Sequence, residues 1–510
     1  MYKNRYNVIF AFFLLFIYDY LFWSQTLGLN VLLFTCLAVP LLVIGNKLSL
    51  VYRNTQVTIM GTLLLAVLVF IYNSGTAKVA YVISFFLMVG FIHQPSLRTV
   101  YNSVLTSLYS LLTFYKNYDE EYRRYKREHQ RLNRSLNLIG LTVIPLIVVT
   151  AFYWIFKFAN PVFDHLSSRV WDALWIYIDG FFAAFSFSHF IFLVVGLSVC
   201  SLVVFNSRYR ELVVNESRFS DVYRRVKNKP EGGRKFGAIY KEFVSEFRIA
   251  VLTISLVNLL LLVVNVIDMQ WVWFNFDYSQ VNNLSQFVHE GTYLLILSIL
   301  ISMGIMLYFF RGNLNLLRKN KSLKVLAYVW IFQNTVLVLS VAIRNYHYIH
   351  QHGLAYKRIG VVLFLILVLY GLFTLVVKIH SLKSSFYLFK VNSWAIYGVL
   401  VFTSLINWDI LIARYNIDHA KNATIDYSFL INLSDKTLYL INENRHLFKG
   451  EGTIDGDHWD YASFLNKRVH DFIRDHPDKD IQSFTVADQH SYEELIKAEN
   501  KTNIETLSNK

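Results

Sequence analysis

Long apolar runs recur along most of this chain and are separated by short polar segments. About eleven of them approach or exceed the roughly 20 residues with which an α-helix crosses a hydrocarbon core about 30 Å thick. Backbone inside lipid must satisfy its own hydrogen bonds, so we predict a helix for each run. The predicted spans are 7–24, 27–46, 55–72, 78–93, 137–158, 173–205, 249–272, 288–310, 325–343, 359–379 and 392–412.

The composition points to the same class of protein. Of the 510 residues, 55% are hydrophobic and only 16% are charged, whereas a typical soluble domain carries about 25% charged residues. The two cysteines, Cys36 and Cys200, lie inside apolar runs and form neither a disulfide framework nor a metal motif. Residues 1–24 lack a small-residue cleavage site, so we expect this segment to be retained as the first span. We therefore predict an all-α, polytopic transmembrane helix bundle.

The distribution of lysine and arginine predicts the orientation of the bundle. Lys3 and Arg5 precede the first span, and alternation of the spans puts Lys47 and Arg53 on the same side as the other strongly basic loops. Basic loops are typical of the cytoplasmic side of a membrane. We therefore predict a cytoplasmic N-terminus and an extracytoplasmic C-terminal tail. The net charge of +14 is explained by these loops, and we expect no nucleic-acid partner.

The chain divides into four predicted parts. They are a group of four spans (1–94), a basic segment (95–135), the main bundle with a cytoplasmic loop at 206–247 (136–412), and the tail (413–510). Two interpretations of the basic segment remain open: a helix at the membrane surface drawn to anionic lipid, or a solvated connector. The tail is polar and acidic, and its low apolar content favours packing onto the outer membrane surface over independent folding.

Polar and ionisable residues gather at the predicted outer ends of several spans. The candidate polar site consists of His289, Glu290, Arg344, His347, His350, Asp409 and Arg414. Asp268 ends the seventh span at the same level, and we expect a loop at 344–358. On a helix, residues 7, 11 and 14 apart lie close to one face. Gln333, Ser340, Arg344 and His347 fit this spacing and, with Asn334 deep in the ninth span, form a polar stripe that we expect to face the other helices.

Each candidate also has a structural interpretation. His289 and Glu290 either cap a helix, where a carboxylate meets the positive end of the helix dipole, or take part in binding or proton transfer. Arg344 forms either an ion pair with Glu290 or Asp409 that fixes helix register, or part of a ligand site. The H-x-x-H-x-H spacing of His347, His350 and His352 would suit a metal. No cysteine or fixed motif accompanies it, so we expect neither a metal nor a cofactor.

Four stretches in fixed order carry a family resemblance. They are VHEGTY (288–293), WIFQNTVLVLSVAIRNYHYIHQHGLAYKRI (330–359), NWDILIARYNI (407–417) and IDYSFLINLSDKTLYL (425–440). The chain resembles a bacterial family of multi-pass membrane proteins catalogued as domain of unknown function 4173, closely over about 240–440 and loosely before that. The resemblance implies an α-helical fold in the bacterial cytoplasmic membrane. It brings no reaction, ligand or partner.

Three classes of function fit these observations. Our first hypothesis is a membrane protein that binds an envelope ligand or partner at an outer-face polar pocket and passes its state inward. The alternative is a membrane-embedded enzyme acting on lipid or glycan at the outer face, with His289 or Glu290 as general acid or base. A transporter comes third, because the chain has only six prolines to break its helices and no internal repeat. The expected partners are membrane lipids and an envelope protein or a lipid or glycan ligand.

Overall fold

The computed structural model describes residues 3–119, 186–222, 236–274, 284–310, 320–421, 423–454 and 456–508, together with scattered positions between 123 and 168. Within these ranges, seven helices are long and apolar enough to cross a membrane, and three shorter apolar helices accompany them. Apart from one two-stranded hairpin, the regular elements of the described residues are helices. The predicted helical membrane bundle is confirmed. The predicted span 137–158 and the first part of 173–205 lie mostly outside the described residues.

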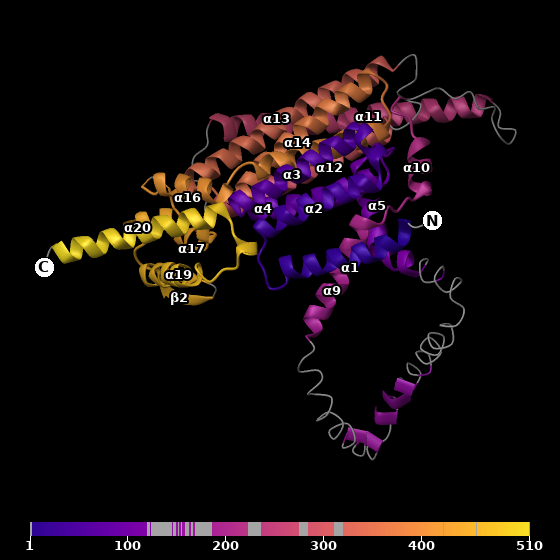
Figure 1. Ribbon diagram of the computed structural model, residues 1–510. Coiled ribbons are helices and arrows are strands. Elements are labelled where there is room, and N and C mark those ends of the chain that lie inside the picture. Colours follow the sequence, from indigo (N-terminus) through magenta and orange to yellow (C-terminus); the bar gives the residue numbers. More distant parts are fainter. Residues whose placement is uncertain are drawn as a thin grey trace.

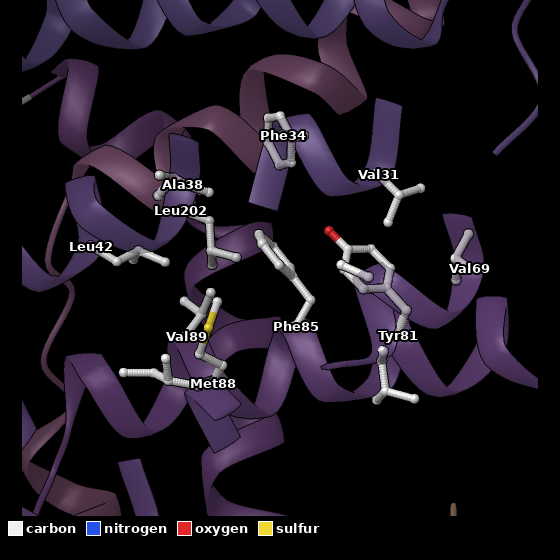
Figure 2. Packing of buried hydrophobic residues seen from close by; sticks show 14 of the residues in the cluster. Val31, Phe34, Ala38, Leu42, Val69, Tyr81, Phe85, Met88, Val89 and Leu202 are labelled. Carbon is white, nitrogen blue, oxygen red and sulfur yellow. The ribbon is translucent and has the colours of Figure 1, made fainter. Parts of the chain in front are cut away.

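The first half of the chain forms one packed group of helices (Figure 1). Its members are α1 (Lys3–Phe22), α2 (Leu29–Gly45), η1 (Lys47–Val51), α3 (Arg53–Tyr72), α4 (Gly75–His93), α5 (Val100–Leu112) and α9 (Phe187–Val204). Phe34 of α2 and Phe85 of α4 meet in its core (Figure 2), and the buried Tyr81 hydroxyl lies 2.8 Å from that of Thr35. The Thr62 and Ser84 hydroxyls pair in the same way at 2.8 Å, so polar side chains link helices of this group to one another.

Helix α5 crosses α4 closely and begins the segment predicted as a surface helix or connector. The Ser103 and Ser107 hydroxyls donate to the carbonyls of Leu87 and Phe86, at 2.8 and 2.6 Å. This part of the segment therefore packs against the bundle. From residue 120 to 135, only Arg123 belongs to the described residues.

Replacing Gly90 with alanine should weaken the α4–α5 crossing. A Cβ at this position would clash with the backbone carbonyl of Ser103, which cannot move without shifting α5. We expect a loss of about 1–3 kcal/mol, as for other overpacked sites, measured by thermal unfolding in detergent. Gly398→Ala is the matched control, because a Cβ there meets nothing within 4 Å. Equal stability of the two variants would contradict the close crossing.

The second half of the membrane region forms a second packed group, which contacts the first through α15 (Ser385–Ser404). It contains α11 (Phe236–Asp268), a π-helical turn η3 (Met269–Phe274), α12 (Leu284–Phe309), α13 (Lys321–His352), α14 (Tyr356–His380) and α15. Its core lies around the fully buried Trp330 of α13. Between the two groups, the short helix α10 (Arg210–Ser217) follows α9.

Two predicted boundaries in this half are wrong. Residues 344–352 were expected in a loop, but α13 continues through them and ends only before Gly353, whose φ of +78° favours glycine. Residues 344–352 contain no glycine or proline, the residues that most often end a helix. Their polar side chains alone do not end it. The predicted eleventh span, 392–412, is in fact split: α15 ends at Ser404, and α16 (Trp408–Asp418) is a separate short helix.

The tail after α16 folds as a small domain on one end of the bundle (Figure 1). Its elements are α17 (Tyr427–Ile431), η6 (Asp435–Thr437), α18 (Leu438–Glu443), η7 (Arg445–Leu447), β1 (Glu451–Ile454), β2 (Asp457–Asp460), α19 (Tyr461–Asp475), η8 (Ile481–Ser483) and α20 (Val486–Ser508). Its buried residues, among them Ile441 and Phe472, form one cluster with Ile412 of α16 and Ile359 of α14. The tail therefore shares its core with the membrane helices.

The two ends of the bundle differ in character. The end next to the tail carries the α1–α2 and α3–α4 turns, both of which hydrogen-bond to the tail; we call it the tail end. The opposite end carries Lys47, Arg53 and Arg98, beside α5 and α10, and we call it the basic end (Figure 1).

Candidate functional site

The predicted polar stripe of α13 lies against α11 and α12. Gln333, Asn334 and Ser340 are all buried. The Trp273 indole donates to the Ser340 hydroxyl at 2.9 Å, and the Ser302 hydroxyl of α12 lies 3.4 Å from the side-chain oxygen of Asn334. These side chains therefore join three helices of the second group.

Helices α11 and α13 meet along a polar seam. The amide groups of Asn258 and Asn265 donate to the backbone carbonyls of Leu326 and Gln333, each at 3.0 Å. In both contacts the donor and the acceptor are 68 residues apart in the sequence, so the two helices run parallel in constant register. The side-chain oxygens of Asn258, Asn265 and Gln333 are buried without a hydrogen-bond partner among the described residues. Such oxygens can accept from water or from a polar solute.

A buried ion pair closes this seam near the tail end. The Arg344 guanidinium lies 2.5 Å from the Asp268 carboxylate, and the two side chains are only 8% and 6% exposed. The sequence suggested Glu290 or Asp409 as the partner of Arg344, and Asp409 is bonded elsewhere. The sequence placed Asp268 at the same end of the spans as Arg344. It did not predict their contact, because hydropathy does not show which helices pack together. A buried pair of this kind fixes the register of two helices when both partners are present.

The histidines of α13 do not converge. His347 is half-buried beside Tyr346, His350 is exposed, and His352 packs its ring 4.7 Å from that of Tyr348. Among the described residues, no group of three or more His, Cys, Asp or Glu side chains is arranged to hold a metal ion.

The predicted His289–Glu290 pair lies in the first turns of α12. Its side chains are outside the described residues, so both interpretations of the pair stay predictions.

Asp409 belongs to a second buried pair, at the junction between tail and bundle. Its partner is Lys436 of the tail, whose side chain is only 1% exposed. The Lys436 ammonium also donates to the carbonyls of Tyr72 and Asn73 at the C-terminus of α3, at 2.9 and 3.1 Å. Asp409 stands in the first turn of α16. The cation therefore binds a carboxylate and the negative end of a helix dipole together.

Arg414, the remaining candidate, is exposed on α16 and faces the Tyr439 hydroxyl of the tail. Burial raises the pKa of the Tyr439 hydroxyl, and Arg414 opposes that shift. Of the residues predicted as one outer site, Arg344 therefore belongs to a pair within the bundle, whereas Asp409 and Arg414 face the tail.

The tail contains a cavity of about 200 Å³ beside this junction. It is lined by His476, Pro477, Lys479, Asp480, Ile481, Ser483, Phe484, Thr485, Asp488, Gln489 and Tyr492. The His476 ring stacks on Tyr492 at 4.6 Å, and its Nε2 lies 3.1 Å from the Gln489 side-chain oxygen. The other ring nitrogen, Nδ1, is buried without a hydrogen-bond partner among the described residues. It can therefore bind a polar group in the cavity.

Three residues of the cavity wall also hold the tail on the bundle. The Asp480 carboxylate accepts from the Gln25 amide at 2.5 Å, and the Ser483 hydroxyl donates to the Gln25 oxygen at 2.7 Å. The Asp488 carboxylate accepts from the Asn73 amide at 2.7 Å. A molecule in the cavity would therefore contact the groups that form the junction.

Sequence reasoning missed this cavity and Lys436. The wall residues come from one polar stretch, 476–492, that contains no recognisable motif. The concentration of ionisable residues in 474–480, RDHPDKD, was the one available signal.

The comparisons with known proteins correct the predicted family. The family model that matches is the Domain of unknown function (DUF4153), over residues 8–444. The resemblance to domain of unknown function 4173 is therefore wrong, and it no longer supports a bacterial location. No curated protein and no solved structure matches the chain. Because the match covers most of its length, this chain belongs to the DUF4153 family.

Proposed function

We propose that this protein is a membrane-bound binding protein whose tail cavity takes up a small polar ligand and whose bundle responds to its occupancy. One observation carries the proposal: Asp480, Ser483 and Asp488 line the cavity and also bond to the turns of the bundle. A ligand that competes for these groups changes the strength of the junction. By thermodynamic linkage, formation of the junction changes the affinity for the ligand by the same factor by which the ligand changes the equilibrium constant of the junction.

The chemistry of the cavity wall supports a small ligand of mixed polarity. Lys479 supplies a cation, Asp480 and Asp488 supply carboxylates, and Tyr492 offers a ring face. The volume of about 200 Å³ is below the roughly 300–1,000 Å³ of drug-sized sites. These properties suit a molecule of amino-acid or monosaccharide size that carries hydroxyl or charged groups.

A thermal-shift screen of the full-length protein in detergent tests this proposal. The probes are free amino acids, monosaccharides and amino sugars. We expect at least one of these classes to raise the melting temperature of the wild type. The same probe should have no effect on His476→Phe, which keeps the ring contact with Tyr492 and removes both ring nitrogens. His470→Phe is the matched control, because His470 is exposed on α19 away from the cavity wall.

Hydrogen exchange on the same samples tests the response of the bundle. The active probe should slow or speed exchange in the turns at 23–28 and 73–75, and not only in the tail. If no probe distinguishes the wild type from His476→Phe, or if exchange changes in the tail alone, the proposal is wrong.

We further propose that the tail faces the extracytoplasmic side. Support comes from Lys47, Arg53 and Arg98, which gather at the basic end, because such residues are typical of the cytoplasmic side. Binding at the tail would then report on conditions outside the cell, and the basic end would face the cytoplasm.

Labelling with a membrane-impermeant maleimide should reveal this orientation. Ser217→Cys marks the basic end and Asp478→Cys marks the tail, each in a background with Cys36→Ser and Cys200→Ser. Both marked positions are exposed. In intact cells we expect labelling of the Asp478→Cys variant alone, and of both variants after permeabilisation. The opposite pattern, or labelling of both in intact cells, would refute the orientation.

A further inference from the structure

A second cavity, of about 530 Å³, lies at the basic end of the bundle. It is lined by residues of α3, α14, α15 and the α4–α5 loop. Its wall consists of Asn54, Arg98, Tyr370, Lys390, Val391, Trp394 and Ala395. The volume falls within the range of about 300–1,000 Å³ that is usual for small-molecule sites.

The polar and apolar residues of this wall are separated by depth. Asn54, Arg98 and Lys390 stand within six residues of a helix terminus at the basic end. Tyr370 lies ten residues before the end of α14, and Ala395 lies ten residues after the start of α15. At 1.5 Å per residue, both are about 15 Å from the basic end. The cavity therefore has a charged mouth and an apolar depth inside a predicted membrane span.

Two cations and two carboxylates meet at the mouth; the Glu216 carboxylate is buried, so the exposed charged groups are two cations and one carboxylate. The Lys390 ammonium pairs with Asp221, and the Arg98 guanidinium lies 3.8 Å from the same carboxylate. One carboxylate is thus shared by two cations. The neighbouring Glu216 accepts from the backbone N–H of Arg98, while the guanidinium donates to the Glu216 backbone carbonyl. The Arg98 and Lys390 side chains stay 38% and 20% exposed, so both can reach an added anion.

The deeper wall is rigid and lies beside a lipid-facing surface. The Trp394 ring stacks on Phe91 at 5.5 Å, and its indole N–H donates to the Arg98 carbonyl at 3.2 Å. On α14, Tyr370 of the same wall is itself 37% exposed. Apolar side chains exposed on a membrane helix face lipid, so an acyl chain can enter the cavity sideways.

We propose that this cavity binds one membrane phospholipid, with its phosphate at Lys390 and Arg98 and one acyl chain along Val391, Ala395 and Tyr370. Charge complementarity and the depth of the cavity select this occupant: a soluble anion would leave the apolar depth empty, and a neutral lipid would leave two cations sharing the single exposed carboxylate of Asp221. Phosphate is the anion that a guanidinium and an ammonium recognise well at a membrane surface. This site is independent of the tail cavity and of its proposed role.

Native mass spectrometry of the delipidated full-length protein tests the proposal. The probes are dioleoyl phosphatidylglycerol, dioleoylglycerol and inorganic phosphate. We expect the phospholipid to bind most tightly. Ala395→Trp fills the apolar depth and should weaken phospholipid binding by about tenfold or more, while Lys390→Gln should weaken it by about fivefold. Lys383→Gln is the matched control. The Lys383 ammonium lies over the Tyr387 ring outside the cavity wall. The phospholipid affinity of this variant should stay within about twofold of the wild-type value.

Each variant is first compared with the wild type by its melting temperature without added lipid. If Ala395→Trp does not fold, Val391→Gln tests the same apolar depth with a smaller change. Equal phospholipid affinity in the wild type, the depth variant and Lys390→Gln would overturn the proposal. So would equal binding of dioleoylglycerol, or displacement of the phospholipid by an equal concentration of inorganic phosphate. The last result would indicate a soluble-phosphate site.

Discussion

Replacing Lys436 with methionine should release the tail from the bundle. The ammonium group is buried against Asp409 and two carbonyls of α3, so its removal leaves a buried carboxylate without its cation. Removing one partner of a buried pair typically costs about 3–5 kcal/mol. We expect the tail to become sensitive to trypsin well below the temperature at which the bundle unfolds. The temperature at which cleavage begins, followed on gels, measures this loss.

Two further variants separate the pair from other effects of the substitution. Lys436→Met combined with Asp409→Asn removes both charges and should recover most of the loss, because no unpaired ion remains. Lys497→Met removes the cation of an exposed pair with Glu494 and should change little, because surface pairs are screened by solvent. Early cleavage in Lys497→Met, or none in Lys436→Met, would contradict the role of Lys436 at the junction.

Replacing Arg344 with methionine should strongly destabilise the second group of helices. Asp268 would then keep a buried charge at the end of α11 without its guanidinium. The expected loss is again about 3–5 kcal/mol. Because the pair lies within the bundle, the main unfolding transition should shift, and the tail should not be released first. Differential scanning fluorimetry in detergent measures the shift.

A double-mutant cycle distinguishes a structural pair from two independent residues. Arg344→Met with Asp268→Asn should be clearly more stable than Arg344→Met alone, which gives a large coupling energy. Arg414→Met is the matched control, because Arg414 is exposed and its loss leaves no buried charge. Additive effects of the two single substitutions would mean that the pair does not fix α11 against α13.

Together, these two pairs suggest how occupancy of the tail cavity could reach the membrane helices. The junction joins the tail to the α1–α2 turn, to the α3–α4 turn and, through Asp409, to α16. The tail also bonds to the end of α13, because the Thr424 N–H donates to the Gln351 carbonyl at 2.8 Å. A shift of the tail would therefore act on both helix groups, including the helix that carries Arg344.

The sequence by itself determined the class of the protein and most of its helices. A run of about 20 apolar residues can satisfy its backbone in lipid only as a helix, and this is a property of the run alone. The helices α3, α4, α13 and α14 accordingly appear where hydropathy predicts them. The errors lie at the ends of helices, at Gly353 and between α15 and α16. Backbone conformation determines where a helix ends, and hydropathy carries no information about it.

Only the tertiary structure decided which charges meet. The sequence identified Arg344 and Asp409 as unusual for their positions, but it named neither Asp268 as a partner of Arg344 nor a role for Lys436. Arg344 binds a residue 76 positions away, and Lys436 binds a carbonyl 363 positions away. Partner choice depends on which helices pack side by side, and many arrangements of apolar helices bury similar area. A buried charge is stable only beside its counterpart, so the packing of the helices fixed both pairs.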